Sequence, residues 1–244
     1  MSGSLVKRRA IQFVRYQYQQ IEPGTQLLAS IIESVDDAIL QLVYDAAFYA
    51  HQDLELALER TIPITYHSCL IHLADDIADG DCDYIDNPIS QGVTAVYTLL
   101  HLFNRSLAQC KIQDTKIFDA LIDVGLWQHK EIATQTWDLE SAKEVAVGIN
   151  ARQFEAYFRI VSSGTQHEKE LANAGYAYAV AAHLSNDINS EDNRFYDIPN
   201  EERNKLIDWA LELSKSSPLP FESGHVYEKG VLQTLVHEAQ LNLR

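Results

Sequence analysis

Apolar side chains recur every three to four positions along most of the chain, which is the spacing of an amphipathic helix. The clearest run occupies residues 25–50, and a second fills residues 114–137. No segment of useful length alternates apolar and polar residues as a half-buried strand does. The pattern therefore predicts an all-α fold, a single-domain antiparallel helical bundle of about nine or ten helices over residues 1–244. The other predicted helices are 5–20, 53–79, 89–110, 140–163, 166–190, 201–215 and 224–243.

Proline and glycine mark where these helices begin and end. Pro23-Gly24 separates the first two helices, and Gly80 is a natural helix stop. Pro63 either kinks the third helix or marks its restart after Thr61. Pro88 is placed to open the next helix. The polar stretches predicted as loops are 81–88 and 191–200.

The charge balance excludes some partners. The chain has 19 lysines and arginines against 35 acidic residues, a net charge of −16. Nucleic acid and anionic membrane surfaces would repel such a chain. We find no uncharged apolar run long enough for a membrane span, and the first residues lack the apolar core of a signal peptide. Three cysteines without metal-ligand spacing indicate free thiols and a cytoplasmic location.

The acidic stretch from His72 to Asp83 is the first candidate site. On a helix, Asp75 and Asp79 lie on one face, and Asp76 lies about 100° around from Asp75. Like charges at this spacing destabilise a helix unless solvent or a cation compensates them. Carboxylate oxygens, with no cysteine or second histidine at binding spacing, favour a hard cation such as Mg²⁺ over zinc.

A second polar cluster, from His183 to Asp192, shares the register of the first. His72, Asp75, Asp76 and Asp79 correspond to His183, Asn186, Asp187 and Ser190, and each cluster ends a long apolar helix. If the two helix ends meet in an antiparallel bundle, they form one mouth lined by oxygen ligands. Such a mouth holds Mg²⁺ ions and, through them, a diphosphate, with an apolar interior behind it.

These motifs resemble those of a known family. Asp75-Asp76-Ile-Ala-Asp79 is similar to the DDxxD motif of trans-polyprenyl synthetases and related class I isoprenoid (terpenoid) synthases. Asn186-Asp187-Ile-Asn-Ser190 resembles their second aspartate-rich segment, and the order and spacing agree over residues 25–243. The metal ligands that the resemblance implies are Asp75, Asp76, Asp79, Asn186, Asp187, Ser190 and Glu191.

The resemblance implies a prenyltransferase mechanism. Mg²⁺ held by both motifs would bind the diphosphate of an allylic prenyl diphosphate and leave an allylic cation in an apolar pocket. Arg152, Lys130 and Arg194 are the cations expected to contact the departing diphosphate. For Arg152 a surface ion pair with Glu155 or Glu144 is the competing interpretation. Family analogy also implies a homodimer.

Departures from the family pattern leave the reaction open. The loop after Gly80 lacks the Arg-Arg-Gly of chain-elongating members, and the basic N-terminal segment is reduced to Lys7, Arg8 and Arg9. Transfer to isopentenyl diphosphate or another acceptor is the first interpretation. The alternatives are a class I terpene cyclase acting on one prenyl diphosphate, and a non-catalytic binding or regulatory subunit. His72 and His183 are expected to be hydrogen-bonded helix residues rather than ligands.

Overall fold

The computed structural model describes residues 2–18, 22–80, 82, 84–134, 137–221 and 225–242. These residues are mostly helical and include no β-strand, which confirms the prediction of an all-α fold. None of the helices among them is long and apolar enough to cross a membrane. The chain divides into two compact units, Met1–Gln113 and Asp114–Arg244. That residues 1–244 form a single domain stays a prediction.

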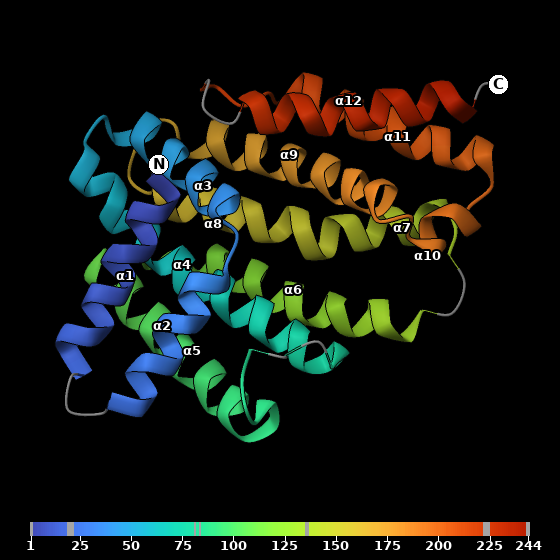
Figure 1. Cartoon of the computed structure of the whole chain (residues 1–244). Helices are drawn as coiled ribbons and strands as arrows, with labels where there is room; N and C mark the ends of the chain where they lie inside the picture. The colour runs from blue at the N-terminus through green and yellow to red at the C-terminus, as the bar shows by residue number, and fades with distance from the viewer. Residues whose placement is uncertain are drawn as a thin grey trace. The chain divides into compact units, whose positions relative to one another are not determined.

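The first unit is built around one long helix, α4. In Figure 1, α4 is surrounded by α1, α2, α3 and α5, and each of them packs against it. Their apolar faces supply buried side chains such as Val6, Ile32 and Leu99. The helices are α1 (Ser2–Tyr18), α2 (Glu22–Ser34), α3 (Asp37–His51), α4 (Leu54–Asp79) and α5 (Val93–Gln109), with a π-helical turn, η1 (Pro88–Gly92), before α5.

The single helix predicted over residues 25–50 is wrong, because the structure has α2 and α3 there. Asp36 lies between them in an extended conformation, and its carboxylate accepts a hydrogen bond from the Ala38 amide. This is an N-cap, which begins a new helix by satisfying an otherwise unpaired amide. The apolar period continues across the junction, so the pattern alone did not reveal the break.

Pro63 lies inside α4, which runs as one helix through it, so a restart after Thr61 does not occur. Proline has no amide hydrogen, and the carbonyl of Glu59, four residues earlier, therefore loses its usual helical donor. The Cys110 thiol lies 3.6 Å from that carbonyl oxygen and donates to it instead. The end of α5 is thereby attached to the proline-modified turn of α4.

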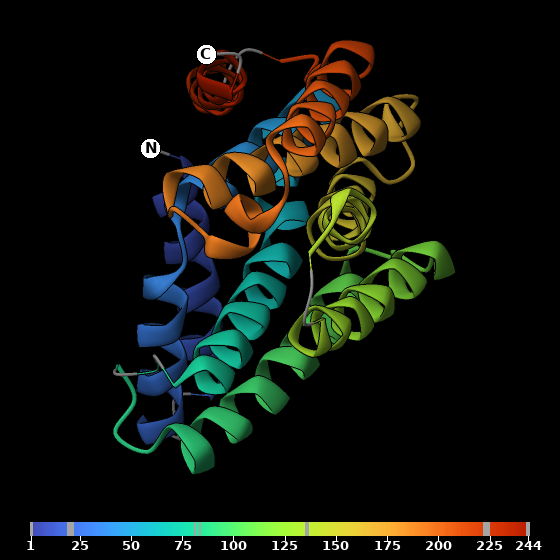
Figure 2. The same cartoon turned by 90° about the vertical axis from the view of Figure 1, so that its right-hand side faces the viewer.

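The second unit is built around α9. Figures 1 and 2 show α9 beside α8, α11 and α12, all of which pack against it. The predicted loop 191–200 contains a short helix, α10, for which Asp192 is the N-cap. The elements are α6 (Thr115–Ala133), α7 (Leu139–Val145), a π-helical turn η2 (Ala146–Ala151), α8 (Arg152–Ser162), α9 (Glu168–Asn189), α10 (Asn193–Asp197), α11 (Asn200–Ser216) and α12 (His225–Asn242).

Both central helices owe their position to sequence. Helices surrounded by neighbours must be apolar on several sides, and α4 and α9 satisfy this over most of their length. Leu73 and Leu184, near their carboxyl ends, are buried. Polar residues gather in the last turn of each, where the helix leaves the core. The fold of each unit thus places one acidic turn at the end of its central helix.

Candidate functional site

The first acidic turn ends where the sequence predicts. Gly80 takes the left-handed conformation, with φ of +82°, and its amide donates to the Asp76 carbonyl, which closes α4. A residue with a Cβ would be strained there. Asp75 is exposed beside it. The side chain of Asp79 lies outside the described residues, so its predicted ligand role stays a prediction.

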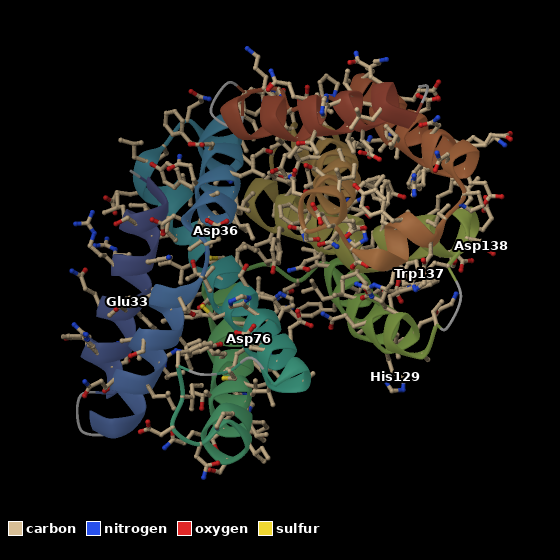
Figure 3. All side chains as sticks on the ribbon, turned by 45° about the vertical axis from the view of Figure 1, so that its right-hand side comes forward. Glu33, Asp36, Asp76, His129, Trp137 and Asp138 are labelled. Atoms are coloured by element: carbon tan, nitrogen blue, oxygen red, sulfur yellow. The ribbon has the colours of Figure 1, made fainter. Side chains whose placement is uncertain are left out.

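Asp76, which Figure 3 labels, has two neighbouring side chains at this turn. The Tyr84 hydroxyl donates to its Oδ2 at 2.6 Å, and His72 Nε2 lies 3.6 Å from the same oxygen. Burial, followed by the hydrogen bond to Asp76, raises the pKa of Tyr84, so the phenol stays protonated and remains a donor. Sequence reasoning missed Tyr84, although its position in the loop after a helix stop is a signal that the chain turns back.

The second acidic turn ends α9 in a different way. The Asp192 amide donates to the Asp187 carbonyl at 2.9 Å, and the Glu191 amide donates to Ile188 at 3.3 Å. This pair of bonds is a Schellman motif, which normally has glycine at its left-handed position. Here Glu191 occupies that position with φ of +54°. Strain of this kind at a helix end often accompanies function.

Asp187 is a partly buried acid of the second turn. Burial raises its pKa, His183 and Arg194 lower it, and the charges of Asp192 and Glu131 raise it further. These groups surround a cavity of about 10 Å³, room for about one water molecule. Burial is thus the main reason why the neutral form of this carboxyl group is favoured.

Arg194 joins the second turn to the end of α6. Its guanidinium lies 2.7 Å from Asp192 Oδ2 and 2.7 Å from Glu131 Oε1. Its carbon also lies 5.2 Å from the centre of the Trp137 ring, which Figure 3 labels. Two carboxylates and a ring face hold this cation, so in the structure it organises the acidic segment. Sequence reasoning named Arg194 and missed Glu131, which is 63 residues away.

The other predicted cations also have carboxylate partners. Lys130 Nζ lies 2.7 Å from Glu144 and 4.1 Å from the centre of the Trp127 ring. Arg152 pairs with Glu155 at 2.8 Å, which is the competing interpretation considered for it. Both cations are about half exposed, and exposed ion pairs contribute little to stability, so they exchange partners at small cost.

A histidine one turn before an aspartate occurs in both units with the same separation. His72 Nε2 lies 3.6 Å from Asp76 Oδ2, and His183 Nε2 lies 3.6 Å from Asp187 Oδ2. The Nδ1 atom of His183 is also hydrogen-bonded to the Asn150 amide at 2.8 Å. The two clusters, which share a register in the sequence, therefore also share the His–Asp distance within their own units.

The oxygen donors fit Mg²⁺ by their chemistry. Among the described residues no three His, Cys, Asp or Glu side chains form a ready metal cluster. Mg²⁺ usually binds one or two carboxylates and takes its remaining ligands from water and substrate phosphates. Asp75 and Asp76 in one unit, and Asp187 with Asn186 in the other, are sets of this kind.

Because the pKa of Asp187 is raised, replacing this residue is expected to stabilise the folded protein, by an amount that depends on pH. Between the ordinary and the raised pKa, the folded protein keeps a proton that the unfolded chain has lost. Stability from this group is complete below the ordinary pKa and is lost as pH rises through the raised one. We therefore expect Asp187→Asn to raise Tm at pH 7 by about 2 °C. Thermal unfolding followed by circular dichroism from pH 3 to pH 8 measures the effect.

The rise in Tm of Asp187→Asn should vanish near pH 3, because the carboxyl group of Asp187 in the unmodified protein is then neutral too. Asp123→Asn, an exposed helical acid in α6, is the matched control and should leave Tm unchanged. A lower Tm for Asp187→Asn at pH 7, or a gain that persists at pH 3, would contradict the raised pKa.

Two solved structures resemble this chain over nearly its whole length. Geranylgeranyl pyrophosphate synthase from Corynebacterium glutamicum, complexed with isoprenyl diphosphate and magnesium, matches with a TM-score of 0.60 and 15% identity, over 99% of this chain and 92% of that chain. A provisionally assigned geranylgeranyl pyrophosphate synthase from the same organism matches with a TM-score of 0.59 and 16% identity, over 98% and 86%.

At these identities the likeness shows the fold alone. The chain has an all-α fold of the isoprenoid synthase type, as the motifs predict. No family model matches the chain, and no curated protein matches its sequence significantly.

Proposed function

We propose that this chain is a Mg²⁺-dependent prenyltransferase that ionises an allylic prenyl diphosphate and transfers the prenyl group to isopentenyl diphosphate or another acceptor. One observation carries the proposal. Each central helix ends in an aspartate held 3.6 Å from a histidine one turn earlier. This pair of ends occurs in a fold similar to that of an enzyme solved with isoprenyl diphosphate and magnesium.

Two sets of oxygen donors would hold the metal in this proposal. Bound Mg²⁺ supplies charge that stabilises the departing diphosphate. Tyr84 orients one of the donors by fixing Oδ2 of Asp76. Arg194 does the same for the second set by holding Asp192 and Glu131 beside Asp187. The proposed ligands are Asp75, Asp76 and Asp79 with Asn186, Asp187, Ser190 and Glu191.

The predicted cations divide into two kinds. Lys130 and Arg152 lie in exposed ion pairs, so a diphosphate can replace Glu144 or Glu155 as their partner. Arg194 is held by two carboxylates and a ring, so breaking its contacts costs more. We therefore propose Lys130 and Arg152 as the diphosphate contacts, and Arg194 as a contact only if Asp192 releases it.

The test is product identification with defined substrates. Geranyl, farnesyl and geranylgeranyl diphosphates are incubated with the protein and Mg²⁺, with and without isopentenyl diphosphate, and products are identified by mass spectrometry. A longer diphosphate formed only with the co-substrate is the expected result for prenyl transfer. A hydrocarbon or alcohol from one substrate alone identifies the cyclase instead.

Diphosphate release is measured in the same reactions. Its absence with every substrate would overturn the enzymatic proposal and favour the binding or regulatory subunit. The homodimer belongs to the same proposal, and sedimentation of the protein used in the assay tests it.

A further inference from the structure

A cavity of about 390 Å³ lies in the first unit, away from the aspartates. Its walls come from α1, from the first half of α4 and from the end of α5. Ile62, which lines it, precedes Asp76 by 14 residues on α4, roughly 20 Å along a helix. Small-molecule sites in proteins commonly enclose about 300–1,000 Å³, so this cavity is large enough for a ligand.

The proline in α4 shapes one wall of the cavity. Because Pro63 frees the Glu59 carbonyl, the thiol of Cys110 binds there and the end of α5 takes its position from that turn. Phe13 and Ile62 supply a half-buried apolar surface. The buried hydroxyl of Ser106, which also lines the cavity, donates to the Leu102 carbonyl at 2.7 Å, so its oxygen can still accept a hydrogen bond.

Positive charge gathers around this cavity in an acidic unit. Arg9 lines it, and the guanidinium of Arg105 lies 5.4 Å from the centre of the ring of Phe13, another lining residue. The charge of Arg60 acts on the thiol of Cys110, a third lining residue. These arginines are three of the seven lysines and arginines in residues 1–113.

One of these arginines has an unmet hydrogen-bonding capacity. The Nε atom of Arg60 is buried and has no hydrogen-bond partner among the described residues. A buried donor without an acceptor is costly, so such groups usually have a ligand or water as a partner. Arg9 is 54% exposed and pairs with Glu55 at 3.0 Å, an exposed contact that a ligand can replace.

We propose that this cavity binds a small organic monocarboxylate with an aromatic or branched apolar body. The guanidinium of Arg9 lines the cavity and matches a carboxylate, and Phe13 and Ile62 take the apolar part. Glu59, which also lines the cavity, repels a multiply charged anion such as a diphosphate. The site is separate from the proposed catalytic function and does not depend on it.

Cys110 provides a reporter for this site. Cys69 and Cys82 are buried, whereas Cys110 is partly exposed, so a neutral disulfide reagent such as 4,4′-dithiodipyridine reacts with Cys110 first. Cys110→Ser must abolish that fast reaction. The probe is 3-phenylpropionate, and the uncharged comparison is 3-phenylpropionamide. At about twice its Kd the carboxylate should slow labelling about threefold, because only a third of the sites remain free.

The matched variants are Arg9→Gln and Arg8→Gln. They remove the same charge from adjacent positions, but Arg8 donates to the Ser4 carbonyl and does not line the cavity. We expect Arg9→Gln to raise the Kd for phenylpropionate about fivefold or more, and Arg8→Gln to leave it unchanged. Circular dichroism confirms that both variants are folded.

Ligand-observed NMR with 3-phenylpropionate and 3-phenylpropionamide measures binding a second time, without using the thiol of Cys110. Preference for the carboxylate in both assays, lost only in Arg9→Gln, supports the site. Three results would overturn it: no binding in either assay, equal binding of acid and amide, or equal effects of the two arginine variants.

Discussion

Replacing Asp76 by alanine is expected to lower the rate of diphosphate release from a prenyl diphosphate more than about tenfold, a loss of about 1.4 kcal/mol or more in transition-state stabilisation. The carboxylate is one of the proposed Mg²⁺ ligands, and its Oδ2 is the atom that Tyr84 fixes. The variant should stay folded, because it removes one of several like charges rather than part of the core. Steady-state diphosphate release at saturating Mg²⁺ measures the loss.

Asp75→Ala should behave in the same way, since Asp75 belongs to the same turn. Asp119→Ala is the control, because it removes an equal charge from an exposed position on α6. Full activity in both Asp75→Ala and Asp76→Ala would refute the metal assignment. A loss of activity that follows a loss of helical circular dichroism would mean that the turn supports the fold instead.

The helix ends that sequence predicts best are those fixed by one local residue. Gly80 ends α4 because a left-handed residue is needed there, and Pro88 opens η1 because its missing amide needs no partner. The break between α2 and α3 depends on one aspartate, Asp36, while the apolar period runs on through it. A long apolar period is a stronger helix signal than one possible N-cap residue is a sign of a break. The sequence therefore predicts one helix where the structure has two.

In the candidate site, too, the sequence predicts the local features and does not predict the long-range contacts. Its acidic turns are local features, and the common register of the two clusters predicts the equal His–Asp separations. The contacts that hold these turns are long-range. Glu131 meets Arg194 from another helix, and no spacing rule connects residues so far apart. Sequence therefore finds the groups that carry the chemistry, and structure adds the groups that hold them.

A single methyl group at Gly175 is expected to destabilise the second unit by about 1–3 kcal/mol, the usual cost of overpacking a core. Gly175 lies in α9 against α8, and an added Cβ would lie 1.7 Å from Cδ2 of Phe158, whose side chain is fully buried. The ring has to move within a packed core, or α8 and α9 have to separate. Thermal unfolding of Gly175→Ala should show a Tm lower by about 5 °C.

Gly125→Ala makes the same chemical change in α6, where no heavy atom of the described residues lies within 4 Å of the added methyl. It should stabilise the protein by up to about 1 kcal/mol, because alanine loses less backbone entropy in a helix. Opposite signs for the two variants locate the effect in the α8–α9 contact. Phe158→Leu, which makes room beside Gly175, should then reduce the cost of Gly175→Ala in the double variant, and strict additivity of the two changes would contradict the contact.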